Sequence, residues 1–181
     1  MPLEKPPSRP SACGPAPSDA DLWTAYIDAS AVPNPGRMAM GAVITAPDGR
    51  RHLLSEPCPE RGCNNEAELR ALMAALQAMQ VLQARRLTIF TDSSILVEQL
   101  TPSPRPIKPI ARLADLFDEA RTMLTGFEHV QLRWIPRHRN TEADALAREA
   151  LLQASIPLRT RTHTHPFAGS RLRPPAACPG A

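Results

Sequence analysis

The feature that most constrains the fold is a long segment with the apolar spacing of an α-helix, which lies between two strand-like segments. A helix is expected over residues 64–82, where leucine and methionine recur at intervals of three or four residues. Residues 51–55 precede it, and Leu-Thr-Ile-Phe-Thr at 87–91 follows it as a β-branched and aromatic segment typical of a buried strand. A strand, a helix and a second strand in this order favour a parallel pair joined by a right-handed crossover. The chain is therefore predicted to contain a sheet with parallel strands.

The flanking segments complete a mixed α/β fold. Residues 22–29 alternate in polarity, and Pro47-Asp48-Gly49 forms a turn between two further strands, so the chain is expected to open with an antiparallel meander. Loops are expected at 33–36 and 56–63. In chain order the expected elements are strands at 22–29, 38–45 and 51–55, a helix at 64–82, a strand at 87–91, helices at 94–100 and 110–124, a strand at 130–134 and a helix at 141–154. This order predicts a five-stranded mixed sheet, with three antiparallel strands followed by parallel strands and helices on both faces.

Proline separates a predicted core from two tails. The chain has 181 residues, of which 21 are proline, and most prolines lie outside the periodic segments. Residues 1–20 and 157–181 are rich in Pro, Ser and Ala and have no apolar face, so both are expected to be disordered tails. Residues 21–156 are long enough to form one domain with its own core.

The net charge of +3 is unevenly distributed along the chain. The C-terminal tail contains Arg159, Arg161, Arg171 and Arg173 and no acid, whereas the core carries a net charge of −1. Attraction to a polyanion must therefore come from a local patch or from the tail.

The sequence lacks the signals of a membrane or secreted protein. No apolar run approaches the ~18 residues that span a bilayer, and the N-terminus lacks the apolar middle of a secretory signal. The 4 cysteines form no CxxC pair, so a reduced cytoplasmic protein with free thiols is expected, with a Cys58–Cys63 bridge as the alternative.

Four acids occupy the ends of predicted elements. Asp28 lies on the first strand, Asp92 ends the fourth, and Glu68 and Asp144 are placed in the first turns of their helices. Each has a structural alternative, since Asp92 can cap a helix and the other two fit capping-box patterns, but Asp within a strand is unusual. If the strands of Asp28 and Asp92 are parallel neighbours, all four side chains can meet at one edge of the sheet.

Such a cluster requires compensating positive charge. Two carboxylates ~5 Å apart repel by about 3 kcal/mol at an effective dielectric constant near 20, and no Lys or Arg adjoins Asp28, Glu68 or Asp92 in sequence. Hard oxygen ligands without Cys or paired His suit Mg²⁺ or Mn²⁺. Two such ions stabilise the attacking and leaving oxygens of phosphodiester hydrolysis. The four acids are therefore predicted to be metal ligands.

Five motifs together resemble the type 1 ribonuclease H family. They are Tyr26-Ile27-Asp28-Ala29-Ser30, Asn34-Pro35-Gly36, Asn64-Asn65-Glu66-Ala67-Glu68-Leu69, Thr91-Asp92-Ser93, and the run from Trp134-Ile135-Pro136 through Arg137-His138-Arg139 to Asp144. They follow the family's order at similar spacings and cover roughly residues 22–153. The resemblance implies a ribonuclease H-like fold and hydrolysis of the RNA strand of an RNA–DNA hybrid with two Mg²⁺ ions, for which Mn²⁺ is a possible substitute.

The resemblance also implies roles for single residues. Asp28, Glu68, Asp92 and Asp144 match the catalytic, metal-binding acids, and His138 matches a histidine linked to proton transfer or product release. Asn34, Asn64 and Asn65 match positions that contact substrate, including ribose hydroxyls, which both donate and accept hydrogen bonds. Ser94 stands where many relatives have a glutamine that contacts the minor groove. Arg137 and Arg139 are candidate phosphate contacts, with a solvated surface as the alternative.

The chain departs from the family pattern in three places. Asp-Gly-Ser is replaced by Asp28-Ala29-Ser30, the glutamine is absent at Ser94, and the basic helix and loop that some bacterial relatives insert is replaced by residues 101–109, with only Arg105 and Lys108 as basic residues. The basic tail 157–181 is a hypothetical substitute, with an inert tail as the alternative. Alternative functions are a nuclease for double-stranded RNA or another structured nucleic acid, and a non-catalytic nucleic-acid-binding module. A monomer is expected from the resemblance.

Overall fold

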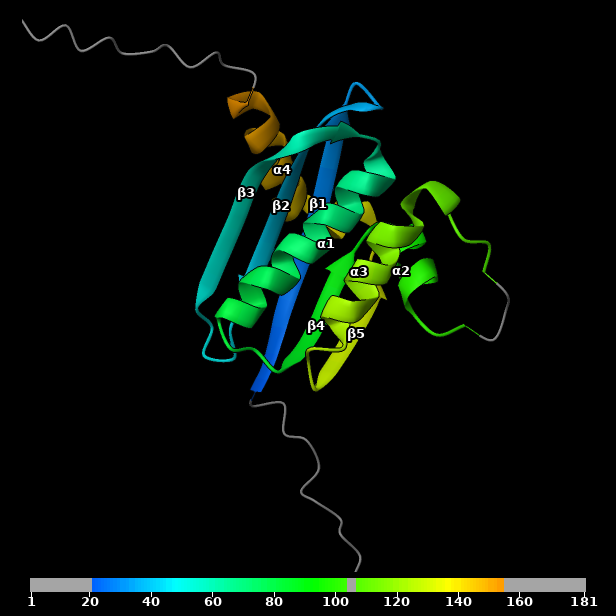
Figure 1. Cartoon of the computed structure of the whole chain (residues 1–181). Coiled ribbons are helices and arrows are strands. Elements are labelled where there is room, and N and C mark those ends of the chain that lie inside the picture. The colour runs from blue at the N-terminus through cyan, green and yellow to red at the C-terminus, as the bar shows by residue number, and fades with distance from the viewer. Residues whose placement is uncertain (1–20, 104–106, 155–181) are drawn as a thin grey trace, which may run out of the picture.

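The structure, a computed structural model, describes residues 21–103 and 107–154 and forms one five-stranded sheet with helices on both faces (Figure 1). The strands are β1 (Leu22–Val32), β2 (Gly36–Thr45), β3 (Arg51–Gly62), β4 (Arg86–Thr91) and β5 (His129–Trp134). The helices are α1 (Asn64–Val81), α2 (Ser94–Leu100), α3 (Ala114–Leu124) and α4 (Thr141–Gln153), with short 3₁₀ turns at Ala111–Leu113 and Arg137–Arg139.

The sheet order β3-β2-β1-β4-β5 confirms the predicted mixed topology. β1 and β2 are antiparallel, as are β2 and β3, whereas β4 is parallel to both β1 and β5. The first strand is therefore central, and its parallel neighbour is the strand that ends just before Asp92. This arrangement fulfils the condition under which Asp28 and Asp92 meet.

The predicted loop over residues 56–63 is wrong, because β3 continues to Gly62. Its second half pairs with the start of β2, from Ala39 opposite Pro57 to Gly36 opposite Gly62, across a bulge. β3 is an edge strand, and an edge strand tolerates prolines because one row of its backbone groups needs no sheet partner. The local sequence resembles a loop, and only pairing with β2 makes it a strand.

The two faces of the sheet are covered unequally. α1, α2 and α3 lie on one face, toward the viewer in Figure 1, and α4 lies behind the sheet. The main core fills the space between the first group and the sheet, and includes Ile27, Ile89, Leu72 and Phe117. α4 packs on β1, β2 and β3. Burial of these apolar side chains is the dominant force that fixes the layers.

Gly41 allows α4 to approach the sheet closely. A Cβ atom at this position would meet the backbone carbonyl of Ala143 and lie 2.6 Å from the nitrogen of Ala147. Gly41 is also the register partner of Asp28 on the neighbouring strand. The absence of a side chain at Gly41 therefore sets how near the start of α4 lies to Asp28.

The other predicted helices and strands differ from the structure only at their ends. The helix expected from residue 110 begins with a 3₁₀ turn and becomes α-helical at Ala114. Cys58 and Cys63 are free thiols. The two predicted tails, the ends of the predicted domain at residues 155–156, and Arg105 lie outside the described residues. Within residues 21–103 and 107–154, no helix combines the length and apolarity that crossing a bilayer requires.

Candidate active site

Three carboxylates from distant parts of the chain converge at the carboxyl end of β4, where its pairing with β1 stops. Asp28, Glu68 and Asp92 each present an oxygen such that the three atoms lie within 4.8 Å of one another. Asp28 lies within β1, and Asp92 directly follows β4. Glu68 lies on α1 just after the first turn, whereas the sequence analysis placed it within that turn. Neighbouring parallel strands and the helix that packs over them thus build the cluster.

The cluster contains polar atoms without hydrogen-bond partners. Asp28 Oδ1 accepts a hydrogen bond of 2.7 Å from the Ala29 amide, but Asp28 Oδ2 is buried and has no partner. Glu68 Oε2 is also buried without a partner. Burial of an unpaired charged oxygen is costly unless a counter-charge or a proton is supplied. The donor set, all carboxylate oxygen, fits a hard divalent cation.

Burial and mutual repulsion disfavour ionisation in this cluster. Burial, and then the charges of Asp92 and Asp144, raise the pKa of Asp28 to about 7, against a hydrogen bond from Ala29 and the more distant Arg137 charge. Burial, and then the charges of Asp28 and Asp92, raise the pKa of Glu68 well above its ordinary value. Without a cation, both carboxyl groups therefore favour the protonated form more than an exposed carboxyl does. A bound cation reverses that preference, so it must displace protons.

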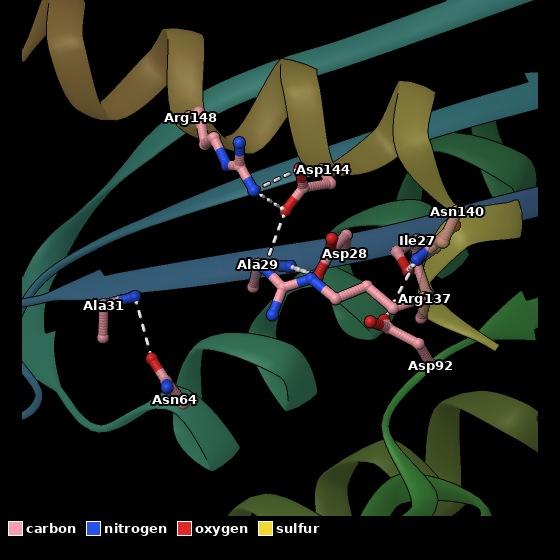
Figure 2. A network of polar contacts seen from close by, with 10 residues as sticks. All are labelled: Ile27, Asp28, Ala29, Ala31, Asn64, Asp92, Arg137, Asn140, Asp144 and Arg148. Atoms are coloured by element: carbon pink, nitrogen blue, oxygen red, sulfur yellow. Dashed lines mark hydrogen bonds and ion pairs between the residues drawn. The ribbon is translucent and has the colours of Figure 1, made fainter.

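Asp144 lies close to Asp28 but is held by two arginines (Figure 2). Its Oδ1 accepts a 3.0 Å hydrogen bond from Arg137, and its Oδ2 lies 2.7 Å from Arg148. Asp144 is not a member of the group whose oxygens fall within 4.8 Å. Its charge nevertheless contributes to the raised pKa of Asp28. The structure thus brings three predicted ligands together and places the fourth at the margin, already neutralised.

The capping alternatives are wrong for three of the acids. The residue before α1 is Cys63, which makes no side-chain cap, so Glu68 belongs to no capping box. α2 is capped by Ser93, whose Oγ accepts from the Leu96 amide at 3.5 Å, and not by Asp92. Asp144 lies in the first turn of α4 but bonds to arginines through its side chain.

Asn140 is a buried residue of the site that the sequence reasoning missed. Its Nδ2 donates to the Ile27 carbonyl at 2.8 Å and to Asp92 Oδ1 at 3.1 Å, while the side chain is 1% exposed. One amide therefore connects the start of α4 to β1 and to the end of β4 (Figure 2). Its place before Thr-Glu-Ala-Asp has the form of a helix cap, which conceals this tertiary role.

Asn34 and Asn64 form a small network beside the carboxylates. Asn34 Oδ1 accepts from the Asn64 amide at 3.1 Å, and Asn64 Oδ1 accepts from the Ala31 amide at 3.0 Å. These bonds join the turn between β1 and β2 to the start of α1. Within the described residues both side-chain NH₂ groups have no acceptor, and both residues are exposed. Asn65 is half-buried on α1, and Ser94 is exposed at the start of α2.

The 3₁₀ turn Arg137–Arg139 borders the site and exposes all three of its side chains. Arg137 reaches Asp144, and its charge opposes the raised pKa of both Asp28 and Glu68. His138 and Arg139 face solvent on the same turn. The structure therefore separates the predicted phosphate contacts: Arg137 is directed to the carboxylates, while Arg139 is open to a ligand.

Comparison with known proteins places the chain in a family. A sequence-family model described as reverse transcriptase-like matches residues 27–150. A ribonuclease HI of Halobacterium salinarum is 36% identical over 127 residues, covering 70% of this chain and 63% of the relative. A bifunctional protein of Mycobacterium tuberculosis is 34% identical over 119 residues, covering 65% of this chain and 32% of the relative. The chain thus spans less than two thirds of the length of these relatives.

Solved structures agree with the sequence comparison. RNase H1 from Halobacterium salinarum matches with a TM-score of 0.65 and 33% identity over 73% of this chain and 98% of the other. LC11-RNase H1 in complex with an RNA/DNA hybrid matches with a TM-score of 0.64 and 28% identity, again over 73% and 98% of the two chains. The fold is therefore that of the ribonuclease H-like class. The chain belongs to the type 1 ribonuclease H family, as the five motifs predicted.

Proposed function

We propose that this protein is an endonuclease that hydrolyses the RNA strand of RNA–DNA hybrids with two divalent metal ions. The observation that carries this proposal is the cluster of three carboxylates whose buried oxygens lack partners. Relatives named ribonuclease HI, and a similar structure that holds an RNA/DNA hybrid, support the substrate class. A monomeric state and a cytoplasmic location remain predictions from the sequence.

We propose Asp28, Glu68 and Asp92 as the principal metal ligands and Asp144 as the fourth. All-oxygen ligation favours Mg²⁺, with Mn²⁺ as a substitute. When bound, two such ions would supply Lewis-acid stabilisation of the attacking and leaving oxygens. Asp144 must loosen at least one of its two arginine contacts to present a free oxygen to a metal. Arg137 and Arg148 therefore set how readily the fourth ligand becomes available.

The asparagine network supports recognition of a ribose-bearing strand. Because the side-chain oxygens of Asn34 and Asn64 are already engaged, their NH₂ groups are left to donate to a ligand. A ribose 2′-OH or a minor-groove base acceptor satisfies such donors, and a deoxyribose lacks that hydroxyl. Asn65 and Ser94 are proposed to extend this surface. His138 is proposed to assist proton transfer or product release, and Arg139 to contact a phosphate.

The experiment is a cleavage assay with labelled RNA–DNA hybrid, RNA duplex and DNA duplex, each in EDTA, Mg²⁺ or Mn²⁺. We expect cleavage of the hybrid's RNA strand only, and only with metal. Asp92→Asn should abolish cleavage, whereas Asp118→Asn, the same change on the exposed surface of α3, should not. Cleavage confined to RNA duplex would support the alternative substrate, and hybrid binding without cleavage in either metal would support a binding module.

We also propose that residues 21–156 are the catalytic unit and that the basic segment 157–181 adds phosphate contacts. Removal of 157–181 should leave cleavage intact but reduce the salt dependence of hybrid binding. Each lost phosphate contact changes the slope of log K against log salt by about 0.9 on a duplex. An unchanged slope and KM after truncation would make this segment a bystander.

A further inference from the structure

One half of the sheet is not covered by α4. α4 packs on β1, β2 and β3, and among the described elements no helix packs substantially on β4 or β5 from that side. The residues of this open face form three rows across β1, β4 and β5, given by the strand register: Tyr26–Phe90–Arg133, Thr24–Thr88–Gln131 and Leu22–Arg86–His129. A hollow of about 290 Å³ lies over most of these residues.

The row nearest the candidate active site combines aromatic rings with a cation. The rings of Tyr26 and Phe90 are stacked, with centroids 4.8 Å apart and planes 22° apart, and both residues are partly exposed. Arg133 is the register partner of Phe90 on β5 and is exposed. Two of its nitrogens donate to Gln131 Oε1 at 3.1 and 2.7 Å, which holds the guanidinium on the open face.

The charge of the open face is positive. Its rows contain the two cations Arg86 and Arg133, the hydrogen-bonding side chain of His129, and no carboxylate. Of the acids at its margins, Glu128 is ion-paired with Arg85 at 3.1 Å and Glu142 with Arg51 at 2.6 Å. Asp21 borders the row of Leu22, and Asp28 and Asp92 lie two residues beyond the row of Tyr26 and Phe90. Within residues 21–103 and 107–154, no carboxylate pairs with Arg133. The open face is therefore complementary to a polyanion.

We propose that the open face binds single-stranded nucleic acid. Partly exposed aromatic rings beside arginines suit bases that are unstacked and available, as they are in a single strand. In this arrangement bases stack on the Tyr26–Phe90 pair while Arg133 and His129 contact phosphates. A duplex, whose bases stack on one another, does not offer those surfaces.

The Tyr26–Phe90 pair lies at the edge of the open face that is nearest to the carboxylates of the candidate active site. Asp28 follows Tyr26 by two residues on β1, and Asp92 follows Phe90 by two residues at the end of β4. Two residues of extended strand span about 7 Å. A second hollow, of about 200 Å³, joins Tyr26 to Arg139 on the turn before α4. An unpaired strand that adjoins a hybrid in the candidate active site can therefore continue onto the open face.

The test measures binding of fluorescein-labelled 12-mers, oligothymidylate and oligouridylate, by anisotropy in EDTA at several salt concentrations. Phe90→Leu keeps an apolar side chain but removes the ring; we expect affinity to fall about 5- to 150-fold, the range for loss of one base–aromatic stack, with the salt slope unchanged. Arg133→Ala should weaken binding and reduce the slope by about 0.7, the value for one single-strand phosphate contact. Binding of either oligomer in this pattern supports the proposal.

The matched control is Arg50→Ala, which removes an exposed arginine from the turn between β2 and β3. It should leave the affinity and salt slope unchanged. Cleavage of a blunt-ended hybrid should be the same in all three variants, so this test is separate from that of the proposed nuclease activity. The proposal is overturned if neither oligomer binds, if Arg50→Ala weakens binding as much as Arg133→Ala, or if sedimentation shows a dimer that Arg133→Ala dissociates.

Discussion

The raised pKa of Asp28 predicts that the metal-free protein is destabilised by its own candidate active site. The pKa is about 7 in the folded protein, against 3.8 for an unperturbed aspartate. Because the folded state holds the proton more tightly, its stabilising effect is complete below pH 3.8 and is lost as pH rises through about 7. A difference of about three pKa units corresponds to about 4 kcal/mol, of which roughly 2–3 kcal/mol is lost between pH 5 and pH 8.

Asp28→Asn removes this titration while retaining an oxygen that can accept from the Ala29 amide. In EDTA, the variant should therefore be more stable than the wild type at pH 8, and its advantage should shrink by roughly 2–3 kcal/mol at pH 5. Urea unfolding followed by circular dichroism at the two pH values measures this difference directly. Mg²⁺ should stabilise the wild type and not the variant, because a ligand that binds only the native state adds to its stability.

Asp118→Asn, on the exposed surface of α3, is the control for loss of one negative charge. Its stability relative to the wild type should be nearly independent of pH. The reasoning is refuted if Asp28→Asn shows the same small and pH-independent change as the control. That result would mean that Asp28 is ionised in the folded protein without a cation, and that its buried oxygen has a partner.

Three further changes test how the site is held together. Asn140→Ala removes two hydrogen bonds from a buried amide, so it should cost about 1–3 kcal/mol in urea unfolding and lower kcat for hybrid cleavage; unchanged stability would contradict the connecting role. Gly41→Ala should cost about 1–3 kcal/mol or more and reduce activity, because the new Cβ meets the backbone of α4; a neutral result would show that α4 can move away freely. Arg148→Ala should change stability by less than about 1 kcal/mol, because the Arg148–Asp144 pair is partly exposed. It should lower the Mg²⁺ concentration for half-maximal cleavage, since Asp144 then attracts the ion more strongly. An unchanged Mg²⁺ midpoint would show that Arg148 does not affect metal binding by Asp144.

Local patterns in the sequence were enough to predict the sheet and the position of the carboxylates. Alternation in β1 and the apolar run in β4 define two strands, and parallel neighbours bring their carboxyl ends together. Asp28 and Asp92 could be placed together only on the condition that their strands are parallel neighbours, which the sheet order confirms. The second half of β3 could not, because its prolines and charged residues have no strand pattern and become ordered only by pairing with β2.

Tertiary partners explain the residues that the sequence left out. Asn140 bonds to Ile27, which lies 113 positions away, and no local pattern reports such a contact. Arg148, in contrast, stands four residues after Asp144, a spacing at which opposite charges on a helix meet. The sequence therefore contains a signal for the Arg148–Asp144 pair, although the two residues are not adjacent in the chain.

Arginine partners compensate the charge of Asp144, whereas Asp28 and Glu68 have raised pKa values, and this difference determines where a cation should bind. Asp144 already has two guanidinium partners, so a metal gains little by approaching it first. Asp28 and Glu68 each have a buried oxygen with no partner, and burial and the neighbouring carboxylates raise the pKa of both groups. A divalent ion that binds between them replaces protons and relieves repulsion together. Metal affinity should therefore reside in Asp28, Glu68 and Asp92, and Asp144 should adjust the site rather than create it.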